Sequence, residues 1–134
     1  MSYVDGYILP IPKRSVRAYR RMAEMGRKMW TKHGALDYKE CVGDDLAPTF
    51  AKPFTRLLKL KPNETAVFAY IVFKSRAHRD QVNKKVMSDP QIKKAMGNTA
   101  MPFDLKRMAY GGFKFLVEGK LNSPQITQIK VSVH

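Results

Sequence analysis

The chain has few of the features that would define a secreted or membrane-bound protein. Its single cysteine, Cys41, excludes an internal disulfide framework and any multi-cysteine metal site. No apolar run approaches the roughly 20 residues of a transmembrane helix. The first residues hold prolines and arginines where a secretory signal would hold its apolar stretch. We therefore expect a soluble cytoplasmic protein without a membrane partner.

Acidic residues are also scarce, with 11 Asp and Glu against 25 Lys and Arg, for a net charge of +14 over 134 residues. Hydrophobic residues make up 44% of the chain, enough to exclude a basic disordered tail. The length favours one domain. We expect that domain to span residues 1–119, followed by a C-terminal extension over residues 120–134 that is either an edge strand or disordered.

Hydrophobic spacing predicts four strands and two main helices. The first half is expected to hold a strand over Tyr3–Pro12, a helix over Val16–His33 capped by Ser15, and a strand over Leu36–Val42. Phe54–Leu60 is either loop or a short strand. The second half is expected to hold a strand over Thr65–Phe73, a helix over Arg76–Met87 capped by Ser75, a helical turn over Gln91–Met96, and a strand over Arg107–Val117.

This order of elements is a split βαβ pattern, which predicts an α+β protein with the ferredoxin-like βαββαβ arrangement. Its four-stranded antiparallel sheet would carry both helices on one face and leave the other face bare. The strands supply more aromatic side chains than one covered face can use, namely Tyr3, Tyr7, Tyr38, Phe68, Tyr70 and Phe113. An exposed apolar sheet marks an interface. We therefore expect a homodimer with the two sheets packed face to face as a dimeric α/β barrel.

Several ordered segments resemble the bacterial YbaA-like family, a family of unknown function in the dimeric α/β-barrel superfamily. They include Tyr3–Tyr7, Ala18–Ala23, Met87–Pro90, Met101–Asp104 and Lys106–Phe113. The resemblance covers roughly residues 1–119 and implies the ferredoxin-like fold and the face-to-face dimer. It implies no activity, because the superfamily includes cofactor-free monooxygenases, haem-handling proteins and binding modules.

A few side chains carry chemistry that a site could use. The catalytic candidates are His33, Arg107 and Tyr110, and the candidate ligand-binding residues are Trp30, Tyr70, His78, Phe103 and Asp104. Imidazole titrates near neutral pH, and an acid, a guanidinium and a phenol together can bind a small polar ligand. The structural alternatives are a hydrogen-bonded histidine, a turn capped by Asp104, and an Arg107 paired with a carboxylate across the dimer. The sequence has no metal-binding motif, and we expect no metal and no cofactor.

The positive charge is concentrated in the two helical regions. Residues 13–33 hold eight basic residues and one acid, and residues 74–97 hold seven basic residues and two acids. Together with the expected fold, the sequence predicts a protein that binds a small ligand between its sheet and its helices. The outer faces of those helices would be basic. The alternatives are a cofactor-free monooxygenase-like enzyme, or a protein that binds nucleic acid or another polyanion through those helices. Nucleic acid is the less favoured partner, because the helical pattern points the aromatic residues inward and leaves none beside the outward arginines for base stacking.

Overall fold

A computed structural model describes residues 2–96 and 100–119. The C-terminal extension expected over residues 120–134 lies outside the described residues. The strands are β1 (Tyr3–Pro12), β2 (Asp37–Val42), β3 (Glu64–Phe73) and β4 (Ala109–Lys114). The helices are α1 (Val16–Lys32), α2 (Phe54–Leu57), α3 (Arg76–Ser88) and α4 (Pro90–Met96), with short 3₁₀ turns η1 (Lys13–Ser15) and η2 (Leu105–Arg107).

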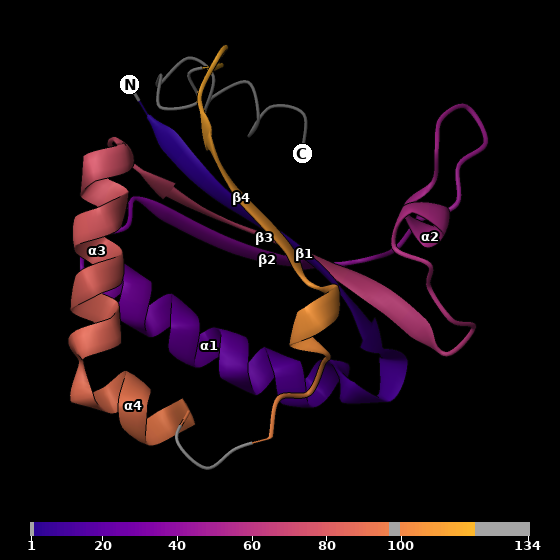
Figure 1. Ribbon diagram of the computed structural model, residues 1–134, viewed down its shortest axis with the longest axis horizontal. Helices are drawn as coiled ribbons and strands as arrows, with labels where there is room; N and C mark the ends of the chain where they lie inside the picture. Colours follow the sequence, from indigo (N-terminus) through magenta and orange to yellow (C-terminus); the bar gives the residue numbers. More distant parts are fainter. Residues whose placement is uncertain (1, 97–99, 120–134) are drawn as a thin grey trace, which may run out of the picture.

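The four strands form one antiparallel sheet in the order β2-β3-β1-β4. This confirms the expected α+β class and four-stranded antiparallel sheet. Figure 1 shows α1, α3 and α4 together on one side of the sheet, whereas α2 lies beyond its end. The two central strands, β1 and β3, pair along their whole length from Tyr3↔Phe73 to Pro12↔Glu64.

Two prolines lie within β1, and the pairing explains why the strand tolerates them. The backbone N–H of Lys13 donates to the carbonyl of Asn63 at 2.9 Å. Alternation along the strand then directs the nitrogens of Pro10 and Pro12 toward the opposite edge. There β1 pairs with β4 only as far as Ile8. The two prolines therefore lack an N–H group only at positions where β1 no longer pairs with β4.

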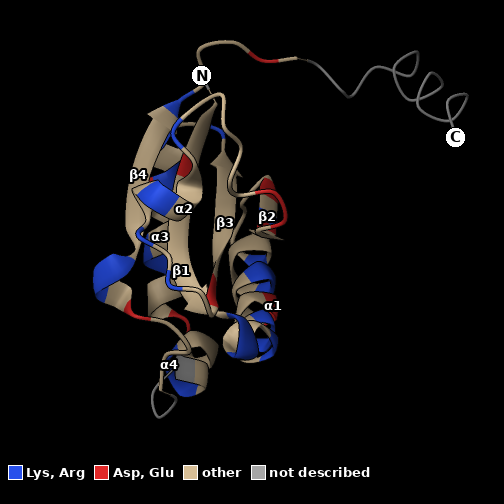
Figure 2. Cartoon of the chain, turned by 90° about the vertical axis from the view of Figure 1, so that its right-hand side faces the viewer, with Lys and Arg blue, Asp and Glu red and all other residues tan. Residues whose placement is uncertain are grey.

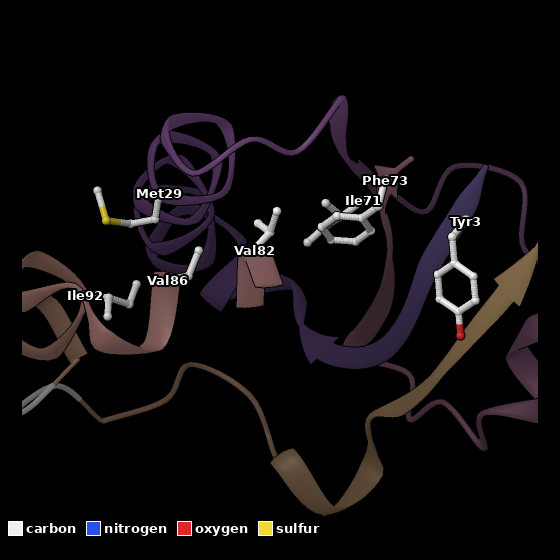
Figure 3. Close-up of a cluster of buried hydrophobic side chains, with 7 residues drawn as sticks. All are labelled: Tyr3, Met29, Ile71, Phe73, Val82, Val86 and Ile92. Atoms are coloured by element: carbon white, nitrogen blue, oxygen red, sulfur yellow. The ribbon is translucent and has the colours of Figure 1, made fainter. Parts of the chain in front are cut away.

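The core lies between the sheet and the helices. Alternate residues of β1 and β3 face α1 and α3, and Phe73 and Ile11 are fully buried there. Figure 3 shows one cluster in which Phe73 and Ile71 of β3 lie near Val82 of α3, together with Tyr3, Met29, Val86 and Ile92. Burial of each such side chain contributes about 1.5–3 kcal/mol.

The opposite face of the sheet is bare in this single chain. Phe68 of β3 is 48% exposed and Phe113 of β4 is 60% exposed, and both belong to the parity that points away from the helices. Cys41 of β2 is exposed on the same parity. The Cys41 thiol is therefore not part of the core of the single chain, because the helices cover only the other face of β2.

Local signals in the sequence were confirmed to different extents. Ser75 caps α3 as expected, because its hydroxyl accepts from the backbone N–H of His78 at 3.0 Å. Ser15 precedes α1, but its side chain makes no capping bond, because the η1 turn already continues into the helix. The short strand considered for Phe54–Leu60 is wrong. Residues 54–57 form α2, which follows the extended Pro53 at a helix start.

Gly112 marks a close approach between the β4 backbone and a side chain of β1. A Cβ at this position would collide with the ring of Tyr3, so the glycine lets that ring approach the β4 backbone. The register from Ala109 to Lys114 is continuous, so the strand contains no bulge. Among the described residues, no helix is long and apolar enough to cross a membrane.

Candidate functional site

The floor of the candidate site is a row of side chains that crosses all four strands. Tyr110 of β4 is in register with Tyr7 of β1, Tyr7 with Ala69 of β3, and Ala69 with Glu40 of β2. All four side chains project from the helix-facing side of the sheet. Because Ala69 is the only small residue in the row, it leaves space between the tyrosine pair and Glu40. The rings of Tyr7 and Tyr110 lie 4.8 Å apart, centroid to centroid.

The inner face of α1 forms one wall above this floor. Its helical spacing directs Tyr19, Ala23, Gly26 and Trp30 to the same side. At Gly26 the helix backbone lies close to a side chain of β2, since a Cβ there would lie 2.6 Å from the hydroxyl oxygen of Tyr38. The small residues of α1 thus make room for aromatic side chains from the sheet.

Glu40 is the polar centre of the site. Its Oε1 accepts a hydrogen bond from the Tyr19 hydroxyl at 2.6 Å, and its Oε2 accepts one from the Tyr38 hydroxyl at 2.6 Å. Glu40 forms no ion pair with any other part of the chain that the structure describes. Two neutral donors therefore hold the carboxylate in place and leave its charge uncompensated. Each carboxylate oxygen keeps a free lone-pair direction.

The tyrosines around Glu40 stay protonated across the physiological range. Burial raises the pKa of Tyr38 well above its usual value, and the charge of Glu40 and the hydrogen bond to it raise it further. The pKa of Tyr19 is raised by burial and by its hydrogen bond to Glu40. Burial and the nearby Asp5 also raise the pKa of Tyr7. All three phenols are therefore hydrogen-bond donors at neutral pH.

The far wall and the cover come from the second half of the chain. Asn83 of α3 accepts a hydrogen bond from the Trp30 indole at 3.0 Å, which joins α1 to α3 at one end of the site. Residues 100–103 line the other end, where the ring of Phe103 packs edge-on against Tyr19 at 5.7 Å. Arg21 and Leu105 are exposed lining residues and mark the rim.

These elements line a cavity of about 790 Å³ between the sheet and the helices, which is partly open to solvent. Its walls are mostly apolar and include five methionines: Met22, Met25, Met87, Met101 and Met108. Methionine side chains are flexible and polarisable, so such walls adapt to a ligand's shape. A second hollow of about 420 Å³ lies between α1 and β2 and shares Tyr19, Tyr38 and Glu40 with the first. The carboxylate therefore borders both spaces.

A second buried carboxylate lies on β1, two residues before Tyr7. Asp5 is completely buried, and its Oδ1 accepts from the Arg79 guanidinium at 2.7 Å. Its Oδ2 has no hydrogen-bond partner among the described residues. Burial raises the pKa of Asp5, while the charge of Arg79 opposes that rise. Arg79 also donates to the Tyr110 hydroxyl and lies over the ring of Tyr3, so the pair anchors α3 to the sheet.

Three of the residues proposed from sequence line the cavity, namely Trp30, Phe103 and Tyr110. The histidines lie elsewhere. His33 Nε2 lies 2.8 Å from Asp89 Oδ2, a contact that joins the end of α1 to the start of α4. His78 Nδ1 accepts from the backbone N–H of Lys74 at 3.0 Å, at the start of α3.

The remaining candidates are also outside the cavity lining. Arg107 makes a two-pronged ion pair with Glu64, at 2.6 and 3.0 Å, within the same chain. It also donates to the carbonyls of Leu58 and Lys59. Asp104 accepts from the backbone N–H of Lys106 in the η2 turn. Tyr70 lies on the bare face of the sheet, beside Phe68.

The sequence reasoning did not select Glu40, Tyr19 or Tyr38 as a group. One signal was available, since alternation in β2 puts Tyr38 and Glu40 on the same face, opposite Cys41. An acidic residue on the covered face of a strand requires a partner. The residues that supply it are Tyr38 itself and Tyr19, 21 positions away on α1. Over residues 2–96 and 100–119, no group of three or more potential ligand side chains could hold a metal ion.

Comparison with known proteins places the chain among uncharacterised relatives. A family model described as "Protein of unknown function (DUF1428)" matches residues 2–105. The chain is 38% identical over 118 residues to the uncharacterized protein YbaA of Escherichia coli strain K12, covering 88% of this chain and 99% of the relative. YbaA of Shigella flexneri matches equally well. Among solved structures, it is similar to the de novo designed protein Foldit4, at 10% identity and a TM-score of 0.43, over 86% of this chain and 99% of the other.

Proposed function

The chain belongs to DUF1428, a family of proteins of unknown function, and we propose that it binds a small, largely apolar molecule in the cavity between its sheet and α1. The observation that carries this proposal is the cavity itself, whose lining includes Ala69 and the hydrogen-bonded Glu40. Ligand sites are concave and mostly apolar, with a few placed polar groups. A volume of about 790 Å³ lies within the range of known ligand pockets, roughly 300–1,000 Å³.

The single tryptophan of the chain makes this proposal directly testable. Trp30 lines the cavity, so a bound molecule that absorbs where indole emits will quench Trp30 by energy transfer. N-phenyl-1-naphthylamine is neutral and apolar, absorbs in that range, and becomes brighter on leaving water. We expect saturable quenching of Trp30 together with a rise in the emission of the dye.

A matched pair of substitutions locates the dye. Ala69→Leu fills the space between Tyr7 and Glu40 and should abolish saturable quenching. Ala77→Leu adds the same volume at an exposed position of α3 outside the cavity lining and should leave binding unchanged. Equal binding by the wild type and by Ala69→Leu, or equal losses in the two variants, would refute the proposed site.

The bare sheet face supports a second part of the proposal, a homodimer in which two ferredoxin-like sheets pack face to face. The strand order β2-β3-β1-β4 and the placement of the helices on one side are consistent with that fold. Phe68 and Phe113 give the open face large exposed apolar groups, and Tyr70 adds a third aromatic ring. A second copy of the same face would remove this apolar surface from water.

A further inference from the structure

The aromatic side chains of the cavity are arranged around one negative charge. Glu40 holds that charge, and its two bonded phenols, Tyr19 and Tyr38, stand beside it. Further rings lie next to these two. Trp30 is 6.4 Å from Tyr38, and Phe103 is 5.7 Å from Tyr19, centroid to centroid. Tyr7 and Tyr110 complete the aromatic lining along the floor.

Glu40 forms no ion pair with any residue that the structure describes. The other buried carboxylate, Asp5, has Arg79 as its counter-ion, but Glu40 has only two neutral hydroxyl donors among the described residues. Arg20, Arg27 and Lys39 line the adjoining smaller hollow, yet none of them forms an ion pair with Glu40. Taking a carboxylate partly out of water has a cost that hydrogen bonds offset only in part, and a bound group with a positive charge would offset more of it.

We propose that the natural ligand of this cavity is an organic ammonium, whose N–H groups or positive charge meet the Glu40 carboxylate while its apolar part lies among the aromatic and methionine walls. This inference rests on the proposed function and specifies its ligand class. Aromatic rings attract a cation through their electron-rich faces. A carboxylate enclosed by rings therefore favours an ammonium over a neutral group of the same shape.

The test uses three molecules that share one apolar part and differ in charge. They are 4-tert-butylbenzylamine, which is an ammonium at neutral pH, the neutral 4-tert-butylbenzyl alcohol, and the anionic 4-tert-butylbenzoate. Their affinities for the wild-type chain are measured by calorimetry and by the change in Trp30 emission. We expect the ammonium to bind at least about tenfold more tightly than the alcohol, which corresponds to about 1.4 kcal/mol. The benzoate should bind most weakly.

Charge removal at Glu40 provides the second arm. Glu40→Gln keeps the shape and still accepts one tyrosine bond, so it should weaken ammonium binding about tenfold and leave alcohol binding within about threefold. Glu118→Gln removes the same charge from an exposed residue outside the cavity and should change neither affinity. The wild-type comparison of the three molecules stands even if the Glu40 variant is poorly folded.

Two results would overturn the inference, and they differ in what else they imply. If the three molecules bind equally well, or the benzoate binds most tightly, and Ala69→Leu abolishes that binding, the ligand class is wrong while the cavity remains a binding site. The other result is that Ala69→Leu abolishes the binding of none of these molecules and does not abolish the binding of N-phenyl-1-naphthylamine. The ligand class and the proposed function then both fail.

Discussion

Gly26 of α1 lies directly against Tyr38 of β2, with space for no side chain between them. A Cβ on Gly26 would be 2.6 Å from the Tyr38 hydroxyl oxygen, which is the atom that donates to Glu40. The glycine therefore weakens α1 by about 1 kcal/mol relative to alanine, but it lets the tyrosine reach the carboxylate. Helix stability and the geometry of the cavity are in conflict at this position.

Gly26→Ala should separate these two effects. We expect the free energy of unfolding to stay within about 1 kcal/mol of the wild-type value, because the helix gain offsets the displaced Tyr38 ring. Affinity for 4-tert-butylbenzylamine should fall several-fold, since Glu40 loses one of its two donors. Chemical denaturation and calorimetry give the two quantities. Tyr38→Phe is the control that removes the same hydroxyl without changing α1, and unchanged binding in both variants would contradict this account.

Removing Arg79 alone from its buried pair with Asp5 should lower the free energy of unfolding more than removing both charges. Arg79→Met leaves a fully buried carboxylate without its counter-ion, which should cost about 3–5 kcal/mol at neutral pH. Adding Asp5→Asn to that variant removes the stranded charge and should recover most of the loss. Urea unfolding of the single and double variants measures this, and a double variant no more stable than Arg79→Met would refute it.

The Arg79→Met variant should also regain stability in acid. Burial already raises the pKa of Asp5, and loss of the opposing arginine charge raises it further. A raised folded-state pKa means that the folded chain binds the proton more tightly than the unfolded chain. The loss of unfolding free energy in the variant therefore grows as pH rises through that pKa. We expect the deficit relative to wild type to be smaller at about pH 4 than at about pH 7.

The ion pair of Glu64 and Arg107 predicts the opposite pH dependence. Hydrogen bonds from Arg107 hold the pKa of Glu64 below its usual value of 4.5. The stabilisation is therefore complete above that value and is lost as pH falls through it toward the lower folded-state pKa. Glu64→Gln should cost about 1–2 kcal/mol at neutral pH, and the difference from wild type should shrink on acidification. Denaturation across pH tests this, with Glu118→Gln as the exposed control.

A charge on the bare sheet face should dissociate the proposed dimer. Phe68→Glu places a carboxylate in the centre of the apolar face, where a second copy would bury it, and should produce monomers in sedimentation velocity at micromolar concentration. Leu57→Glu is the matched control, since Leu57 is similarly exposed but lies on α2. A monomeric wild type, or a Phe68→Glu variant that remains dimeric, would reject the face-to-face arrangement.

Local pattern was sufficient for most of the framework. The apolar stripe of α1 and the continuous apolar run of β3 predicted elements that the structure places within one or two residues. The secondary structure before β3 was harder to predict, because two prolines and scattered leucines show no clear period. The structure has the short helix α2 there. Arg107 shows a further limit. Its residue type favoured a ligand or a dimer partner, but the chain supplies Glu64, which is 43 positions away.

By itself, the sequence determined the order of strands and helices, the basic outer surface of α1 and the parity that separates Glu40 from Cys41. Figure 2 shows this basic surface, with lysine and arginine along the outward side of α1. Only the tertiary structure brought Tyr19 and Tyr38 onto one carboxylate and opened a cavity above Ala69. Periodicity specifies which face of an element is covered. Register between strands and the seating of a helix decide which side chains meet on that face, and those depend on packing across the whole core.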